Sequence, residues 1–136
     1  MFLQMLNKQQ QELFYELAIK AAEADGIIAS EEKNLLNLYA KEINVSPKYS
    51  TERVIGDVTN EIAICSNKVI KKIMIFEILG IMVSDSVYDL REKEFIKKLS
   101  SDLNISMKEI DKMLDYLSKY LAFYKEMYSF ILSENE

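Results

Sequence analysis

The side chains best suited to chemistry in this sequence are two pairs of carboxylates with the same spacing. Asp25 precedes Glu32 by seven residues, and Asp85 precedes Glu92 by seven residues. In each pair the first acid follows an apolar helical stretch, and the second lies in the first turn predicted for the next helix. Oxygen-only clusters suit hard cations. The pattern therefore predicts an acidic site for Ca²⁺, Mg²⁺ or Mn²⁺ formed by Asp25, Glu32, Asp85 and Glu92.

A purely structural role for the same acids stays open. Acids at the start of a helix interact favourably with the helix dipole, and each contributes about 0.3–1 kcal/mol. An EF-hand is excluded, although the stretch from Asp25 to Glu32 matches the second half of an EF-hand loop. The two earlier ligand positions of such a loop fall on Ala21 and Glu23, and Ala21 cannot bind a cation.

The composition excludes most other kinds of site. The 136 residues include no His and one Cys, which rules out His-based nucleophile sites, Cys-rich zinc sites and disulfides within the chain. A net charge of −5 opposes binding to nucleic acid. Glu77, in an apolar stretch, is a candidate general acid or base, but the sequence indicates no second group for it. We therefore expect a protein that is not an enzyme.

The elements that must position these residues are helices, because apolar residues recur with helical spacing almost throughout. We predict an all-α fold of about seven helices. Expected N-caps are Asn7, Ser30, Ser46 (with Pro47 opening a third helix), Asn67, Asp89 and Ser106. Gly26 is expected to cap the first helix in the left-handed conformation.

The location of the protein is predicted from the apolar runs. The longest, residues 73–83, is too short for the roughly 20 residues that span a bilayer, so no membrane insertion is expected. No signal peptide is recognisable at the start of the sequence. We expect a cytoplasmic protein in which Cys65 is a free thiol.

An internal repeat of sixty residues organises the chain as a single domain, 1–136. Shifting the sequence by sixty superimposes Asp25 on Asp85, Glu32 on Glu92 and residues 43–46 on 103–106. The copies span about 8–64 and 68–120, and a helical extension follows at 121–133. Each copy is a predicted three-helix unit, and burial of the two apolar faces against each other favours pseudo-twofold packing.

A stripe of tyrosines marks the C-terminal part of the chain. Tyr116, Tyr120, Tyr124 and Tyr128 lie four residues apart and share one face of a helix. Such a stripe is either half-buried core or a face that binds a partner, and packing in the core or at its edge is the expectation.

The repeated connector resembles the TerB-like domains, a family that includes the tellurite-resistance protein TerB and the N-terminal domain of a J-domain co-chaperone. The resemblance rests on residues 21–28 with Glu31 and Glu32, and on residues 82–85 with Glu92. It implies a duplicated helical fold, a role in tellurite resistance or stress, and an acidic face at Asp25, Glu32, Asp85 and Glu92 that could bind a divalent cation. The alternative is a protein-interaction or scaffold module that uses the acidic face or the Tyr stripe, as a homo-oligomer or with another protein.

Overall fold

The protein is all-helical in the part of the chain that the computed structural model describes, residues 2–24, 28, 30–83 and 88–134. A 3₁₀ turn and six α-helices occur there, and no strand is found among these residues. The all-α prediction is confirmed, and the number of helices is close to the seven expected. The elements are η1 (Leu3–Met5), α1 (Lys8–Ala22), α2 (Ser30–Ile43), α3 (Ile55–Cys65), α4 (Lys68–Met82), α5 (Leu90–Asp102) and α6 (Met107–Leu132).

Local sequence explains how several of these helices begin. In α1 the Gln10 backbone N–H donates to Asn7 Oδ1 at 2.8 Å, and the Asn7 N–H donates to Gln10 Oε1 at 2.9 Å. This reciprocal arrangement satisfies two backbone donors that the helix itself leaves unpaired. Equivalent boxes start α5 and α6, and Asn67 caps α4. The predicted cap at Gly26 lies outside the described residues, and Ser30 is the first helical residue of α2 rather than its cap.

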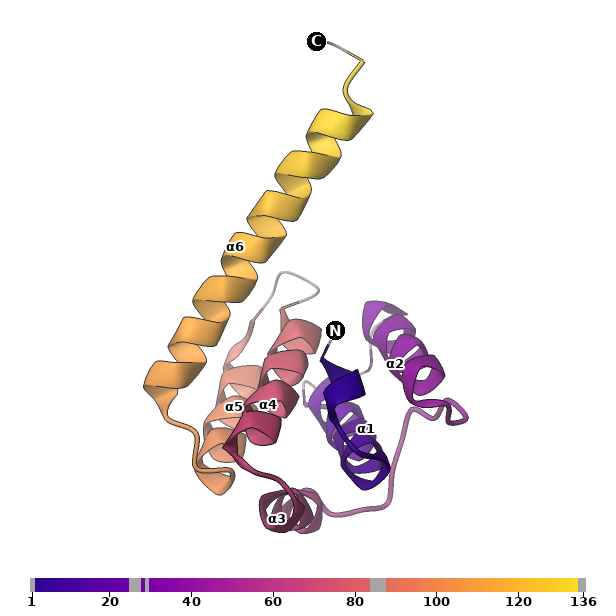
Figure 1. Ribbon diagram of the computed structural model, residues 1–136, viewed down its shortest axis with the longest axis vertical. Helices are drawn as coiled ribbons and strands as arrows, with labels where there is room; N and C mark the ends of the chain where they lie inside the picture. The colour runs from indigo at the N-terminus through magenta and orange to yellow at the C-terminus, as the bar shows by residue number, and fades with distance from the viewer. Residues whose placement is uncertain (1, 25–27, 29, 84–87, 135–136) are drawn as a thin grey trace.

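The core lies around α1 and α4, which run side by side (Figure 1). α1 also packs against α2 and α3, and α4 packs against α5 and α6. Phe14 and Leu17 of α1 and Ile78 and Leu79 of α4 are fully buried. The central position of α4 explains why its sequence is apolar on nearly all sides.

The first two helices of each predicted copy have boundaries sixty residues apart to within one residue. α1 and α4 begin and end at equivalent positions, and the side chains of Asn7 and Asn67 each accept from the backbone N–H three residues later. Asn44 and Asn104, which follow α2 and α5, both adopt left-handed backbone angles, with φ of 61° and 58°. Asn tolerates this conformation better than most residues. Pseudo-twofold packing of the two halves stays a prediction.

The predicted helix beginning at Ser46 and Pro47 is wrong. The chain from Val45 to Val54 is an irregular connector, and α3 begins only at Ile55. Contacts with α1 explain the difference: the Tyr15 hydroxyl donates to the Lys48 carbonyl at 3.0 Å and accepts from the Lys48 N–H at 3.1 Å. A backbone group bonded to a neighbouring helix in this way is unavailable for a local helical turn.

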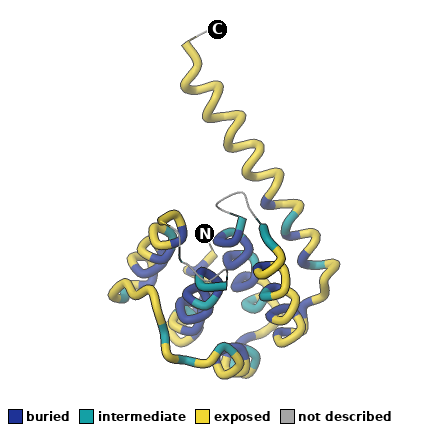
Figure 2. The backbone as a smooth tube through the Cα atoms, turned by 180° about the vertical axis from the view of Figure 1, so that it is seen from behind, coloured by how far each residue is buried: buried dark blue, intermediate teal, exposed yellow. Residues whose placement is uncertain are grey.

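α6 is one continuous helix, although the sequence left open a separate segment after residue 120. Its first part packs on the body through Ile110, Met113 and Leu117. From Ser118 to Glu134 every residue is exposed, and the helix projects away from the other elements (Figures 1 and 2). The third helices of the two predicted copies therefore differ in start, length and burial.

Candidate functional site

The predicted acidic site is described only in part. Glu32 and Glu92 lie in the first turns of α2 and α5 and are 2% and 3% exposed, whereas Asp25 and Asp85 lie outside the described residues. Across the described ranges, no group of three or more carboxylate or thiol side chains is arranged to hold a metal ion. The four-residue cation site therefore stays a prediction.

Glu92 has a defined structural role in this region. Its backbone N–H donates to Asp89 Oδ1 at 2.9 Å, and its own Oε1 accepts from the Asp89 N–H at 3.2 Å. Beside it, burial raises the pKa of Tyr88 to about 12, and the negative charges of Glu92 and Asp111 add to the increase. Sequence reasoning missed Asp111, because it lies on α6 and only the packing of that helix brings it near the connector.

Glu77 joins three parts of the fold. One carboxylate oxygen accepts from the Phe2 backbone N–H at 3.0 Å, and the other accepts from the Tyr39 hydroxyl at 3.2 Å. Burial raises the pKa of Tyr39, and the charge and hydrogen bond of Glu77 raise it further. These contacts link the N-terminal segment, α2 and α4, and they support a structural role for a carboxylate that the sequence singled out for its apolar surroundings.

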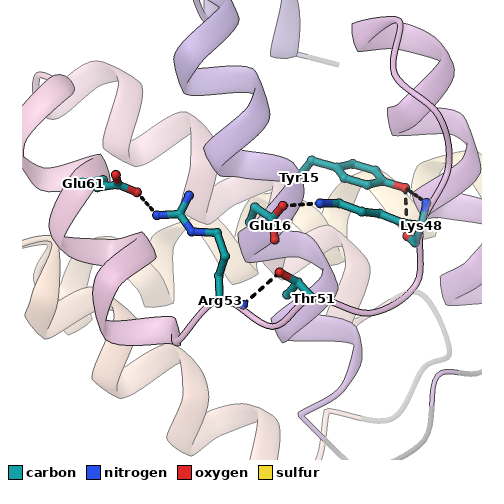
Figure 3. Close-up of polar contacts among 6 residues, drawn as sticks. All are labelled: Tyr15, Glu16, Lys48, Thr51, Arg53 and Glu61. Carbon is teal, nitrogen blue, oxygen red and sulfur yellow. Dashed lines mark hydrogen bonds and ion pairs between the residues drawn. The ribbon is translucent and has the colours of Figure 1, made fainter.

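A second cluster of charges lines a surface pocket of about 460 Å³ between α1 and the connector after α2 (Figure 3). Glu16 is only 9% exposed and forms an ion pair with Lys48, and Arg53 pairs with Glu61. Burial acts to raise the pKa of Glu16. The hydrogen bond and charge of Lys48, helped by the Thr51 hydroxyl and the Arg53 charge, outweigh burial and hold this pKa below its ordinary value of 4.5.

The pocket offers one unsatisfied acceptor. Among the described residues, Oε2 of Glu16 is buried without a hydrogen bond of ordinary geometry. A water molecule or one N–H donor could satisfy it. Both cations of the pocket already pair with carboxylates of the same chain. The arrangement therefore favours attachment of the connector to α1 over recognition of a charged ligand, and nothing in the sequence pattern pointed to Glu16.

The most exposed apolar surface lies on α6, and the expectation that the Tyr stripe packs into the core is wrong. Tyr116, Tyr120, Tyr124 and Tyr128 are all at least half exposed. The last three form a ladder along the helix: the ring centroids of Tyr120 and Tyr124 are 6.5 Å apart, and those of Tyr124 and Tyr128 are 6.1 Å apart. Tyr120, Tyr124 and Tyr128 are exposed because α6 extends past the body at this point (Figure 2).

Further exposed apolar side chains flank this ladder. We call the whole surface the distal face of α6, which consists of Tyr120, Leu121, Phe123, Tyr124, Met127, Tyr128, Phe130 and Ile131. The charged residues of this part of the helix, Lys119, Lys125 and Glu126, lie outside this face and border it, because each is four residues from one of its members. The distal face is therefore a continuous apolar surface along the projecting part of α6.

Comparisons with known protein families, with curated proteins and with solved structures found no match. Among the described residues, no helix combines the length and the apolar character needed to cross a membrane.

Proposed function

We propose that this protein is an interaction module that assembles with a protein partner through the distal face of α6. The single observation that carries the proposal is the exposure of eight apolar side chains along about three turns of helix. Contiguous apolar patches of this kind mark interaction sites in soluble proteins. Tyr, Phe and Met, which dominate this face, are enriched at interfaces. Lys and Glu, which are depleted at interfaces, lie outside it.

The energetics of the helix support the same proposal. The segment after Leu117 makes no packing contact that buries any of its residues. Helices shorter than about 12–15 residues are marginal in water without tertiary contacts. A partner on the distal face would supply such contacts and would remove the aromatic rings from water. Binding would thus stabilise the helix as well as the complex.

Site-specific photocrosslinking in the cells that express the protein tests this proposal. A benzophenone amino acid replaces Phe123 on the distal face, and the matched control replaces Ser129 on the polar side. We expect a discrete adduct from position 123 that disappears when Tyr124→Lys is added, and none from position 129. Absence of an adduct at position 123, or equal adducts at both positions, would contradict the proposal. Mass spectrometry of the adduct identifies the occupant.

A second candidate is the TerB-like function, a domain of tellurite resistance or stress response that binds a divalent cation through Asp25, Glu32, Asp85 and Glu92. The observation that favours it is the near-complete burial of Glu32 and Glu92 at positions sixty residues apart. Surface acids that only complement a helix dipole do not require such burial.

Titration with Ca²⁺, Mg²⁺ and Mn²⁺ tests this candidate. We expect the amide signals of both acidic connectors to respond to one cation, and Glu32→Gln to abolish the response. Ca²⁺ and Mg²⁺ report through chemical shifts and paramagnetic Mn²⁺ through line broadening. If neither connector responds at millimolar metal, the cation site does not exist.

A further inference from the structure

We infer that the occupant of the distal face is a second copy of this chain, packed antiparallel with Tyr124 close to the twofold axis. This inference rests on the proposed function and names the partner. It is carried by the continuity of one helical seam, by the amount of exposed surface, by the charge balance of the helix and by the position of the body beside it.

The seam that holds α6 on the body continues without interruption into the exposed part. Ile110, Met113 and Leu117 are buried against the body. The same alternation of three- and four-residue steps then reaches Tyr120, Tyr124, Met127 and Ile131. This is the spacing of helices that pack side by side as coiled coils. The exposed half therefore has the pattern of a helix with a helical neighbour.

The surface area agrees with an interface of ordinary size. The chain exposes 8581 Å², whereas a compact monomer of its 15.8 kDa mass exposes about 7,300 Å². The excess is about 1,300 Å², and a stable interface of standard size buries about 800 Å² per partner. Pairing of two distal faces over an interface of this size would thus remove more than half of the excess.

Charge favours a second copy over a membrane surface. Six charged residues lie between Ile110 and Leu132, three acidic and three basic, and all fall outside the seam: Asp111, Lys112, Asp115, Lys119, Lys125 and Glu126. Helices that lie on anionic membranes carry an excess of Lys and Arg on the polar side. A helix without net charge approaches a copy of itself without repulsion from its own residues.

The helices packed against the first half of α6 determine whether two copies can pair parallel or antiparallel. In a parallel pair the two seams would face each other along the whole helix, and each body already covers the first half of its own seam (Figure 1). An antiparallel pair overlaps only over the projecting segment, about 22 Å for fifteen residues at 1.5 Å each. The bodies then lie at opposite ends. With Tyr124 on the axis, Tyr120 faces Tyr128 and Leu121 faces Met127. Ile131 lies at the level of Leu117, which is buried against the body of the other copy.

Sedimentation equilibrium of the purified full chain tests the inference. We expect twice the 15.8 kDa monomer mass at concentrations of about 100 µM, above the roughly micromolar constants of weak specific complexes. Tyr124→Lys should restore the monomer mass, and the matched control Ser129→Lys, which adds the same charge on the polar side, should stay dimeric. Far-UV circular dichroism reports whether each variant remains helical. A monomeric native chain would overturn the inference.

Disulfide formation tests the orientation in a Cys65→Ser background. Tyr124→Cys should form a covalent dimer under mild oxidation, and Ile131→Cys should not, because residue 131 of one copy lies beside residue 117 of the other. Crosslinking of both variants would overturn the antiparallel arrangement in favour of a parallel one. Crosslinking of neither would overturn pairing through this face.

The failure of this inference is distinguishable from the failure of the proposed function. If the purified chain is monomeric and the crosslinker at position 123 forms an adduct with a different protein, the proposed interaction function stands. The second copy is then excluded as its partner. Cosedimentation of a monomeric chain with vesicles of phosphatidylcholine and phosphatidylglycerol, with no protein adduct, overturns both in favour of a lipid surface.

Discussion

The contact between Glu16 and Lys48 leads to a prediction with a defined pH dependence. Glu16 is buried on α1, and Lys48, whose side chain is 49% exposed, neutralises it from the connector that the sequence predicted as helical. Replacing Lys48 with Met keeps most of the side-chain length and removes the charge and the donor. The carboxylate is then left buried without its principal partner.

The magnitude follows from the burial of the two groups. A hydrogen bond to a charged group contributes about 1.5–3 kcal/mol, and the exposure of Lys48 reduces this through solvent screening. We expect Lys48→Met to lower the free energy of unfolding by about 1–2 kcal/mol at pH 7. The corresponding fall in thermal midpoint is roughly 3–8 °C for a chain of this length.

The sign of the pH dependence is set by the lowered pKa of Glu16. In the native chain this carboxyl titrates below its ordinary value of 4.5, so its contribution is present above pH 4.5 and is lost as the pH falls through the folded pKa. Lys48→Met removes the hydrogen bond and the charge that lower the pKa of Glu16. Burial, which raises this pKa, then moves it upward. The stability difference between native chain and variant should therefore shrink on acidification from pH 7 to pH 3.

Urea unfolding followed by circular dichroism, at one protein concentration so that self-association is equal, measures this difference. Lys97→Met, at an exposed lysine within α5, is the matched control and should change stability by less than about 0.5 kcal/mol at both pH values. In a Glu16→Gln background the pH dependence of the Lys48→Met effect should disappear. If Lys48→Met lowers the free energy of unfolding by the same amount at pH 3 as at pH 7, the electrostatic explanation is refuted.

Two further predictions concern groups inside the fold. Glu77→Ala should lower the free energy of unfolding by about 3–5 kcal/mol, because it leaves a cavity and two donors without a carboxylate. In a double-mutant cycle measured by urea unfolding, Tyr39→Phe should reduce this loss by about 1 kcal/mol, and strict additivity would show that the Tyr39 hydrogen bond contributes nothing. Asn104→Ala should lower the unfolding free energy by about 1 kcal/mol while Asn104→Gly is nearly neutral, because φ is 58° at this position; equal effects of the two substitutions would exclude backbone strain as the cause.

Helix positions and helix ends were largely predictable, because both depend on neighbours in sequence. The predicted N-caps placed the first residue of α1, α4, α5 and α6 as observed, and that of α2 within one residue. The capping residues Asn7, Asn67, Asp89 and Ser106 act within three residues of themselves, so their role is visible without a fold. The helical connector predicted from Ser46 and Pro47 failed because Tyr15, more than thirty residues away, bonds its backbone.

The candidate sites divide in the same way. The sequence by itself determined the acidic first turns that contain Glu32 and Glu92 and the tyrosine spacing on α6. It also excluded His-based nucleophile sites, Cys-rich zinc sites and disulfides within the chain. Only the tertiary structure decided that both glutamates are buried, that Asp111 approaches Tyr88 and that Glu16 lines a pocket. It also decided that the tyrosines face solvent. Helical periodicity specifies which side chains share a face, but where a helix extends past its neighbours depends on the packing of the whole chain.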